Sequence, residues 1–452
     1  MQNLFGGNMK KLTRGFVAII AAVLAATVFM IGCQAKDGRV KLSVLNYFSL
    51  ANPGAAAEIS NVWDVFASAN PDINIQREDA FEESFHQTTE AYAAAGKLPD
   101  VLYAWPGGRS TTLHANRLLR DLSPFIERDG LASQFNELAL NPDNQAGGYL
   151  AMIPLGMTTS SVFYVNTEVL DAVGLQPAGT YAQLVSQVPV LRAAGYDTVI
   201  MANADAWVMQ STFFSMLAGR FGGEGWEQKI LSGQAKFTDP AFVNALRFVQ
   251  RMYQDGVLSQ ATLATSYGDT PGAFATNRGA YMIDGDWRVG AFITDQTTGQ
   301  ALISPEKQGN IRITVFPTIE GTALNNSASV TMSTGWAMSA ATPEGSPQEE
   351  AAWKLIKWLT GREVQTFMVS SGGLPTPSRT DIDLSGISLE PMQQSIAKIA
   401  GEFATGTVVI DAVFSSDVYN PLNDGLQAIG LGTMTPEQVA DIIQAAYEAS
   451  QM

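Results

Sequence analysis

Aromatic rings and a basic group follow two strands that the sequence predicts near its start. Tyr47 and Phe48 come directly after a segment of alternating polar and apolar residues, and Trp105 and Arg109 follow a short apolar run. Because open α/β sheets bind ligands at the carboxyl ends of their strands, we expect Tyr47 and Phe48 at a ligand-binding edge. Ring faces stack on the C–H groups of a sugar, whereas arginine, amides and carboxylates bind its hydroxyls. The residue types therefore fit an uncharged polyol.

The elements that position these residues alternate between strand and helix. The predicted order is a strand at Val40–Leu45, a helix with Ile59, Val62, Trp63 and Phe66 on one face, a strand at Ile73–Ile75, a helix at Phe85–Ala95 ended by Gly96, and a strand at Val101–Ala104. This βαβαβ order predicts a parallel sheet with helices on its faces.

The same alternation returns later in the chain. Strands are predicted at Val162–Val165, Thr198–Met201, Ile311–Phe316 and Trp336–Ser339, and helices at 206–219, 239–254 and 349–360. In the last helix Thr435 is the expected N-cap before Pro436, and Val439, Ile442, Ile443 and Ala446 share one face. There is no internal repeat or low-complexity linker, so we expect the chain to cross between lobes within the fold.

The N-terminus has the order of a secretory signal. Lys10, Lys11 and Arg14 precede an apolar run that ends at Cys33. This run is at the short limit for a bilayer span, which favours a cleaved signal peptide, residues 1–32, starting at Met1 or at Met9. Cys33 is the only cysteine, so the chain forms no intramolecular disulfide.

The residues around Cys33 give it a different role. Met30–Cys33 resembles a lipobox, and we expect Cys33 to be lipidated and residues 33–39 to form a tether. An ordinary signal peptide that happens to contain a cysteine is the alternative. The protein is then extracytoplasmic, in the periplasm or on the cell surface, and touches the membrane through its lipid anchor only.

Charge and length exclude some classes of protein. The formal net charge is −16, and removal of three basic residues with residues 1–32 gives −16 − 3 = −19, so nucleic acid is not an expected partner. The remaining 452 − 32 = 420 residues exceed what one core organises, so two lobes are expected. Charged residues are 15% of the chain, against about 25% in average domains, which fits large packed cores.

A series of short motifs, from about Val40 to the C-terminus, is similar to the extracellular solute-binding proteins that serve sugar importers, the family of the maltose-binding protein. In family order these are Gly96–Val101, Leu118–Leu122, Gly148–Pro154, Phe163–Asn166, Gly174–Pro177 with Thr180–Leu184, Phe274–Met282 with Gly285–Trp287, Ala352–Leu359 and Gly373–Pro375. Each motif is weak alone, and their common order carries the resemblance.

The resemblance implies a two-lobed periplasmic-binding-protein-like α/β fold of type II. Each lobe is then a mainly parallel sheet flanked by helices, with the ligand in the cleft between them. The implied lobes are 40–156 with 316–362, and 157–315 with 363–452. The implied function is capture of a mono- or oligosaccharide by hinge closure and its delivery to the permease subunits of an ABC importer, without catalysis or a cofactor.

The resemblance also implies site residues. Trp105 and Arg109 resemble an aromatic and charged pair that contacts sugar, and Thr159 and Ser160 stand where the maltose-binding protein has an acidic contact. Further implied ligand contacts are Trp207, Asp286, Trp287 and Trp336. Asp286 could instead cap a turn, and Trp207 and Trp336 could instead fill a core. The helical spacing of Trp63, Trp353 and Trp358 indicates core positions.

Other classes of function remain open. A surface glycoside hydrolase needs two facing carboxylates, and no acidic pair stands in a recognisable catalytic motif. His86 and His114 lack metal-ligand spacing, so we expect no metal site and place both on helix or loop surfaces. A binding protein for a polyamine or a peptide is the remaining alternative, and a polyamine would need several carboxylates in the site.

Overall fold

The computed structural model describes residues 38–142, 145 and 147–451. The predicted signal peptide, Cys33 and most of the predicted tether therefore lie outside the described residues. Within the described ranges, no helix has both the length and the apolar composition needed to cross a bilayer.

The first of three sheets confirms the predicted βαβαβ unit. In spatial order it contains β2 (Ile73–Ala80), β1 (Val40–Tyr47), β3 (Val101–Ala104), β11 (Gly335–Met338) and β4 (Met152–Pro154). β1 pairs in parallel with β2 and β3, whereas β11 pairs antiparallel with both of its neighbours. Among the described strands of this sheet, β11 alone is therefore antiparallel to the others.

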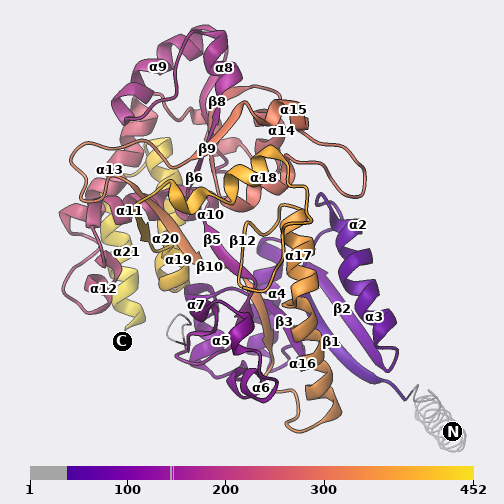
Figure 1. The fold of residues 1–452 in the computed structure, drawn as a ribbon. Coiled ribbons are helices and arrows are strands. Elements are labelled where there is room, and N and C mark those ends of the chain that lie inside the picture. The colour runs from indigo at the N-terminus through magenta and orange to yellow at the C-terminus, as the bar shows by residue number, and fades with distance from the viewer. Residues whose placement is uncertain (1–37, 143–144, 146, 452) are drawn as a thin grey trace, which may run out of the picture.

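Helices cover both faces of this sheet. They are the continuous helical segment α2 (Ala55–Glu58), a π-helical turn (Ile59–Trp63) and α3 (Asp64–Ala69), together with α4 (Glu83–Ala94), α16 (Pro347–Leu359) and α17 (Arg362–Ser370). One face packs around Trp63, Trp336 and Trp353, and the other around Phe85 and Leu102. We call this sheet and its helices the first lobe, at the lower right of Figure 1.

The second sheet has a similar plan. Its spatial order is β7 (Asp197–Ile200), β8 (Gly279–Asp284), β6 (Val162–Asn166) and β9 (Ile311–Thr314), and β6 alone among them runs against the others. Alternate residues of β6 enter two different cores, Phe163 and Val165 on one face and Val162 and Tyr164 on the other. Both faces are thus covered, which explains why the strand reads as an unbroken apolar run.

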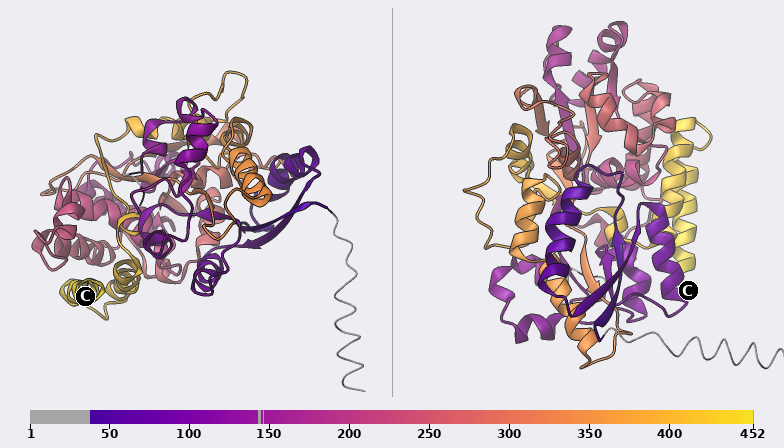
Figure 2. Two further views of the ribbon diagram at one scale, coloured as in Figure 1. Left: turned by 90° about the horizontal axis from the view of Figure 1, so that it is seen from below. Right: turned by 90° about the vertical axis from the view of Figure 1, so that its right-hand side faces the viewer.

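The helices of this second lobe come from two parts of the chain. They include α8 (Thr167–Ala172), α9 (Tyr181–Ala193), α10 (Trp207–Met209), α11 (Ser215–Gly222), α13 (Pro240–Gln254), α18 (Pro391–Ile396), α19 (Ile410–Val413), α20 (Ser416–Leu431) and α21 (Pro436–Ser450). Figure 2 shows the last two, in yellow, along one side of the molecule.

The third sheet joins the two lobes. It contains β12 (Thr376–Pro377), β5 (Gly156–Thr159), β10 (Ser327–Met332) and β13 (Thr405–Thr407). The chain passes from β4 through β5 into β6, and returns from β9 through β10 to β11. Since β5 and β10 pair antiparallel, these two crossings lie side by side, as the hinge of a two-lobed fold requires. A third crossing runs from α17 through β12, which pairs with β5, to α18.

Most of the predicted elements are confirmed, but the predicted buried face of the last helix is wrong at Ile442. The last helix begins at Thr435 with a capping box to Gln438, as predicted. Ile442 is 44% exposed, whereas Val439 and Ile443 are buried. The buried stripe therefore runs through Ala440 instead, because only one side of α21 faces the core.

The predicted lobe boundaries stay a prediction. The first lobe is expected to end at residue 362, yet Val364 and Val369 of α17 pack in the core around Trp353. This packing favours a boundary after α17.

Candidate functional site

A cluster of rings lies at the carboxyl ends of β1, β2 and β3. Its members, which we call the first ring cluster, are Tyr47, Phe81, Phe85, Tyr103 and Trp105. The ring centroids of Tyr47 lie 4.9 Å from those of Trp105 and 4.7 Å from those of Phe81. Tyr47 and Trp105 are each half-buried, so part of each ring remains open to a ligand. The structure therefore brings these two predicted residues together where the strand order indicated.

Arg109 is committed to a residue from the other lobe. Its Nε donates to Asp411 Oδ2 at 2.7 Å, and its guanidinium lies 5.4 Å from the ring centroid of Tyr419. The Arg109 and Asp411 side chains are 14% and 9% exposed, so the pair is largely shielded from water. Much of the charge that we expected to bind hydroxyls is thus used between the lobes.

The prediction that both histidines lie on helix or loop surfaces is wrong for His114, whereas His86 is half-buried on α4. His86 packs 4.7 Å from the Trp105 ring, and its Nε2 lies 3.3 Å from Arg109 Nη1. Burial and then the charge of Arg109 lower the pKa of His86 to about 3, so the ring is neutral at pH 7 and accepts a hydrogen bond from Arg109. His114 is 3% exposed, and burial followed by Arg117 lowers its pKa to about 4.

The loop before Arg109 needs its glycines. A Cβ on Gly107 would stand 1.6 Å from the carbonyl oxygen of Ala412, and one on Gly108 would stand 2.0 Å from that of Phe414. Gly107 also has φ +61°, in the left-handed region. The backbone of the first lobe thus contacts α19 of the second lobe directly beside the ion pair of Arg109.

A second group of rings comes from the second lobe. Trp207 packs on Tyr267 with ring centroids 4.9 Å apart, and Trp287 Nε1 donates to the Tyr267 hydroxyl. The guanidinium of Arg288 lies 3.7 Å from the Tyr267 centroid, while its Nε donates to Asp284 Oδ2 at 2.6 Å. We call Trp207, Tyr267 and Trp287 the second ring cluster. The structure thus unites two predicted tryptophans through a tyrosine that sequence reasoning missed.

Asp286 lies at the hinge. It is 1% exposed, and its Oδ2 accepts a hydrogen bond of 2.7 Å from the main-chain N–H of Thr159 on β5. Burial raises the pKa of Asp286 to about 7, although hydrogen bonds from Thr159 and Trp287 act in the opposite direction. In this conformation the Asp286 carboxyl group therefore binds β5, one of the segments that cross between the lobes.

The side chains of the remaining predicted residues are buried and make contacts within the protein. Phe48 is 5% exposed, with the guanidinium of Arg77 5.1 Å from its ring centroid, and Trp336 is 4% exposed in the first core. The Ser160 hydroxyl donates to the Ser211 carbonyl at 3.0 Å. The structure does not bring these side chains to the open edges of the ring clusters.

Groups beside the two ring clusters affect one another's pKa values across the lobes. The pKa of Tyr267 is raised by burial and by Asp284, and Tyr47 of the first lobe adds to this rise. The pKa of Glu82, which follows β2, is raised first by burial and then by Asp205 of the second lobe, whereas Arg288 lowers it. Glu82 also holds a left-handed backbone, φ +53°, which is costly for a residue other than glycine.

Sequence reasoning missed Glu82, Asp205 and Arg288 because nothing in their local sequence distinguishes them from solvated charges. Together the two ring clusters and these charged groups contain ring faces, carboxylates and an arginine, the group types that bind a hydroxyl-rich ligand. In the described part of the chain, no group of three His, Cys, Asp or Glu side chains could hold a metal ion.

Two cavities lie away from the ring clusters. The larger, of about 460 Å³, is in the first lobe and is lined by residues that include Phe135, Lys357 and Arg379. The smaller, of about 310 Å³, is in the second lobe beside Asn166 and Lys307. The charged groups of both are paired with neighbours, Arg379 with Asp381 and Lys307 with Glu168. The charged groups that line these two cavities therefore already have partners within the protein.

The sequence matches a model of a protein family. The sequence model described as bacterial extracellular solute-binding protein matches residues 50–366. No curated protein matches this sequence.

Solved structures share the fold at low sequence identity. A chitin oligosaccharide binding protein has a TM-score of 0.79 at 19% identity, over 92% of this chain and 100% of that one. A protein from a study of xylan utilization by Caldanaerobius polysaccharolyticus has a TM-score of 0.78 at 21% identity, over 90% and 99%. The maltose/maltodextrin-binding domain MalE from Bdellovibrio bacteriovorus, bound to maltotriose, has a TM-score of 0.69 at 18% identity, over 91% and 99%.

Proposed function

We propose, on the premise that this chain belongs to the family of bacterial extracellular solute-binding proteins, that it captures a mono- or oligosaccharide between its lobes and delivers it to an ABC importer. The observation that carries this proposal is that each lobe contributes a ring cluster, and that Tyr47 of the first cluster contributes to the raised pKa of Tyr267 in the second. A ligand that touches both clusters favours the conformation in which the lobes are together. Release to the permease then requires the lobes to separate.

The ring clusters suit the faces of sugar rings. Trp105 and Tyr47 form one wall, and Trp287 and Trp207 form the other. Glu82 and Asp205 provide acceptors for hydroxyl protons, and Arg288 provides a donor. A chitin oligosaccharide binding protein and a maltose/maltodextrin-binding domain bound to maltotriose share this fold, which supports a saccharide as the ligand class here.

The anchoring is part of the same proposal. Cys33, as the lipidated first residue of the mature protein, would hold it at the outer side of the cell membrane, beside the permease. Replacement of Cys33 by Ser should release the protein from the membrane fraction, and metabolic labelling with a fatty acid should fail. Fractionation with the unmodified chain as the reference tests this.

Calorimetric titration tests the ligand class. The chain from Gly38 onward should bind at least one member of a panel of xylo-, chito- and malto-oligosaccharides and simple hexoses. Trp105→Ala and Trp287→Ala should each weaken that binding at least tenfold, because each removes a wall of the site. Trp358→Phe is the matched control, since Trp358 packs in the first lobe with its indole N–H donating to Val62.

Two results would contradict the proposal. Binding of spermidine, with no response to any sugar, would assign the carboxylates Glu82 and Asp205 to a polyamine. Sugar binding that survives both tryptophan substitutions would place the site elsewhere.

A further inference from the structure

A loop of the second lobe reaches a helix of the first. The loop runs from Thr294 to Ala301, which are joined by a β-bridge, and it leaves and re-enters the core that contains Ile293 and Ile303. The helical segment begins at Ala55 and packs its later turns on the first core. Figure 1 shows a loop beside α15 (Pro305–Gln308) that descends toward α2.

Two hydrogen bonds join these elements across the lobes. The main-chain N–H of Gly54 donates to Asp295 Oδ2, and that of Ala57 donates to Thr297 Oγ1 at 3.2 Å. The same loop makes a third hydrogen bond to the first lobe. Gln296 Nε2 donates to Ser370 Oγ, at the end of α17, at 3.2 Å. Every one of these bonds breaks when the lobes separate at this edge.

The helix lacks a cap of its own. Its N-cap residue is Gly54, with φ +75° and no side chain to accept a hydrogen bond from the first turn. The first N–H groups of a helix need acceptors from outside it, and a carboxylate there also interacts favourably with the helix dipole. Asp295 and Thr297 provide both from the opposite lobe.

The two oxygens of Asp295 have separate tasks. Oδ1 accepts the main-chain N–H groups of Thr297 and Thr298 at 2.9 and 2.7 Å, which folds the loop, and Oδ2 faces Gly54. Oδ1 of Asp295 therefore stabilises the fold of the loop, and Oδ2 binds the start of the helix.

We propose that the loop 294–301 is a latch that caps the Ala55 helix in trans and so favours the closed arrangement of the lobes before any ligand binds. This inference rests on the proposed function only in assuming that the lobes open and close. The latch lowers the cost of closure, so it adds to the affinity for ligand without touching the ligand.

Asp295→Asn isolates the latch. The amide oxygen can keep the turn bonds within the loop, while the amide N–H₂ replaces Oδ2 and sets a donor against the donor of Gly54. Thr297→Val removes the second acceptor with little change of shape. The two variants should fold as the parent does, which circular dichroism checks.

Distances between spin labels measure directly how far apart the two lobes are. The chain from Gly38 onward contains no cysteine, so labels at the exposed positions 97 and 171, one in each lobe, are unique. In the absence of ligand, Asp295→Asn should lower the ratio of closed to open molecules roughly tenfold, the scale of a hydrogen bond to a charged group. Thr297→Val should lower it less.

Asp383→Asn is the control, because Asp383 accepts a local bond from the Ser385 N–H in an exposed turn. A distance distribution that is the same for the parent and Asp295→Asn would overturn the latch, as would a parent with no closed population. These measurements contain no sugar, so their outcome is independent of whether the proposed ligand class is right.

Discussion

Asp286, a buried carboxyl group between the lobes, couples stability to pH. Burial raises its pKa to about 7, whereas an aspartate in an unfolded chain titrates near 3.9. Its stabilising effect is therefore complete below about pH 4 and is lost as the pH rises toward 7. Asp286→Asn keeps an oxygen for the Thr159 N–H and carries no charge. We expect this variant to be more stable than the parent at pH 8 by roughly 2 kcal/mol.

Urea unfolding at pH 5 and pH 8 measures this difference. The advantage of Asp286→Asn should be smaller at pH 5, where the parent carboxyl is already protonated. An advantage of the same size at both pH values would contradict the assignment.

At the residue scale, the sequence predicted the positions of rings better than the roles of charges. Tyr47 and Trp105 lie where strand ends predicted them, because the carboxyl edge of a sheet follows from local alternation. The role of Arg109 could not be predicted, since its partner Asp411 is 302 positions away. His86 packs on Trp105 and Arg109, which are about twenty positions away in the sequence, so local pattern did not predict these contacts.

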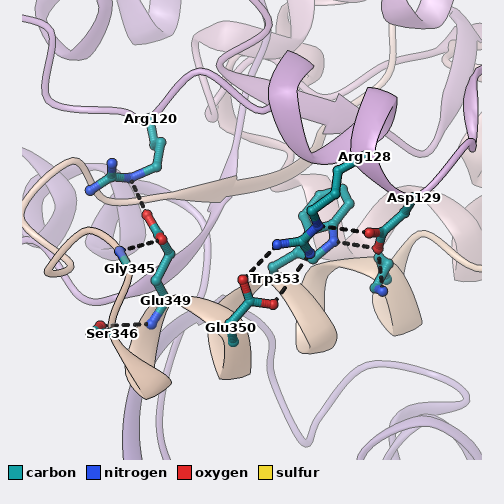
Figure 3. Close-up of polar contacts among 9 residues, drawn as sticks. Arg120, Arg128, Asp129, Gly345, Ser346, Glu349, Glu350 and Trp353 are labelled. Carbon is teal, nitrogen blue, oxygen red and sulfur yellow. Dashed lines mark hydrogen bonds and ion pairs between the residues drawn. The ribbon is translucent and has the colours of Figure 1, made fainter.

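At the scale of elements, the first turn of α16 offers two adjacent glutamates in different surroundings (Figure 3). Glu349 accepts from the Gly345 N–H at 2.8 Å, and its carboxylate lies 3.2 Å from Arg120 Nε, with side chains 7% and 18% exposed. Glu350 pairs with Arg128 at 2.6 Å, but its side chain is 55% exposed.

We therefore expect unequal costs for the same substitution. Glu349→Gln should lower the free energy of unfolding by about 2 kcal/mol, because it leaves the Arg120 charge without a partner. Glu350→Gln should lower it by about 0.5 kcal/mol or less, since exposed pairs contribute little. Denaturant titrations of the two variants compare them, and equal costs would contradict the reasoning.

A second matched pair tests the contact between the Gly107 loop and α19. Gly107 and Gly96 share almost the same backbone, φ +61° and +62°, but nothing lies within 4 Å of a Cβ on Gly96. Gly96→Ala should cost about 1 kcal/mol from backbone strain alone. Gly107→Ala should cost about 3 kcal/mol or more, because the methyl group meets the Ala412 carbonyl. Thermal unfolding measures both, and similar losses would show that the loop can move away.

Periodicity predicted most helices and strands, but not the third sheet. β12 and β13 are two and three residues long and carry little apolar pattern, so no local signal marks them. The π-helical turns at Ile59–Trp63 and Gln210–Phe214 were also missed, because one extra residue per turn hardly changes an apolar stripe.

At the scale of the whole molecule, ligand binding should raise the unfolding temperature in proportion to the logarithm of ligand concentration. A sugar at one hundred times its dissociation constant should add about 2.7 kcal/mol to the stability of the folded form. Scanning calorimetry over a range of concentrations measures this increase. A sugar alcohol that does not bind is the control. An unfolding temperature that does not change with ligand concentration would contradict binding to the folded state.

The two-lobed division was predictable from length and from the order of family motifs. The lobe boundaries were not, because packing decides them, as the contact of Val364 and Val369 with the first core shows.

The place of β11 between β3 and β4 has a consequence for the order of folding during synthesis. The first sheet lacks its inner strand until Met338 has left the ribosome, and the core around Trp226 lacks α20 and α21 until the last residues follow. A nascent chain that stops at residue 320 thus holds no finished lobe. It would stay open to proteases and chaperones along its whole length, whereas a protein with two consecutive domains would already have folded its first half.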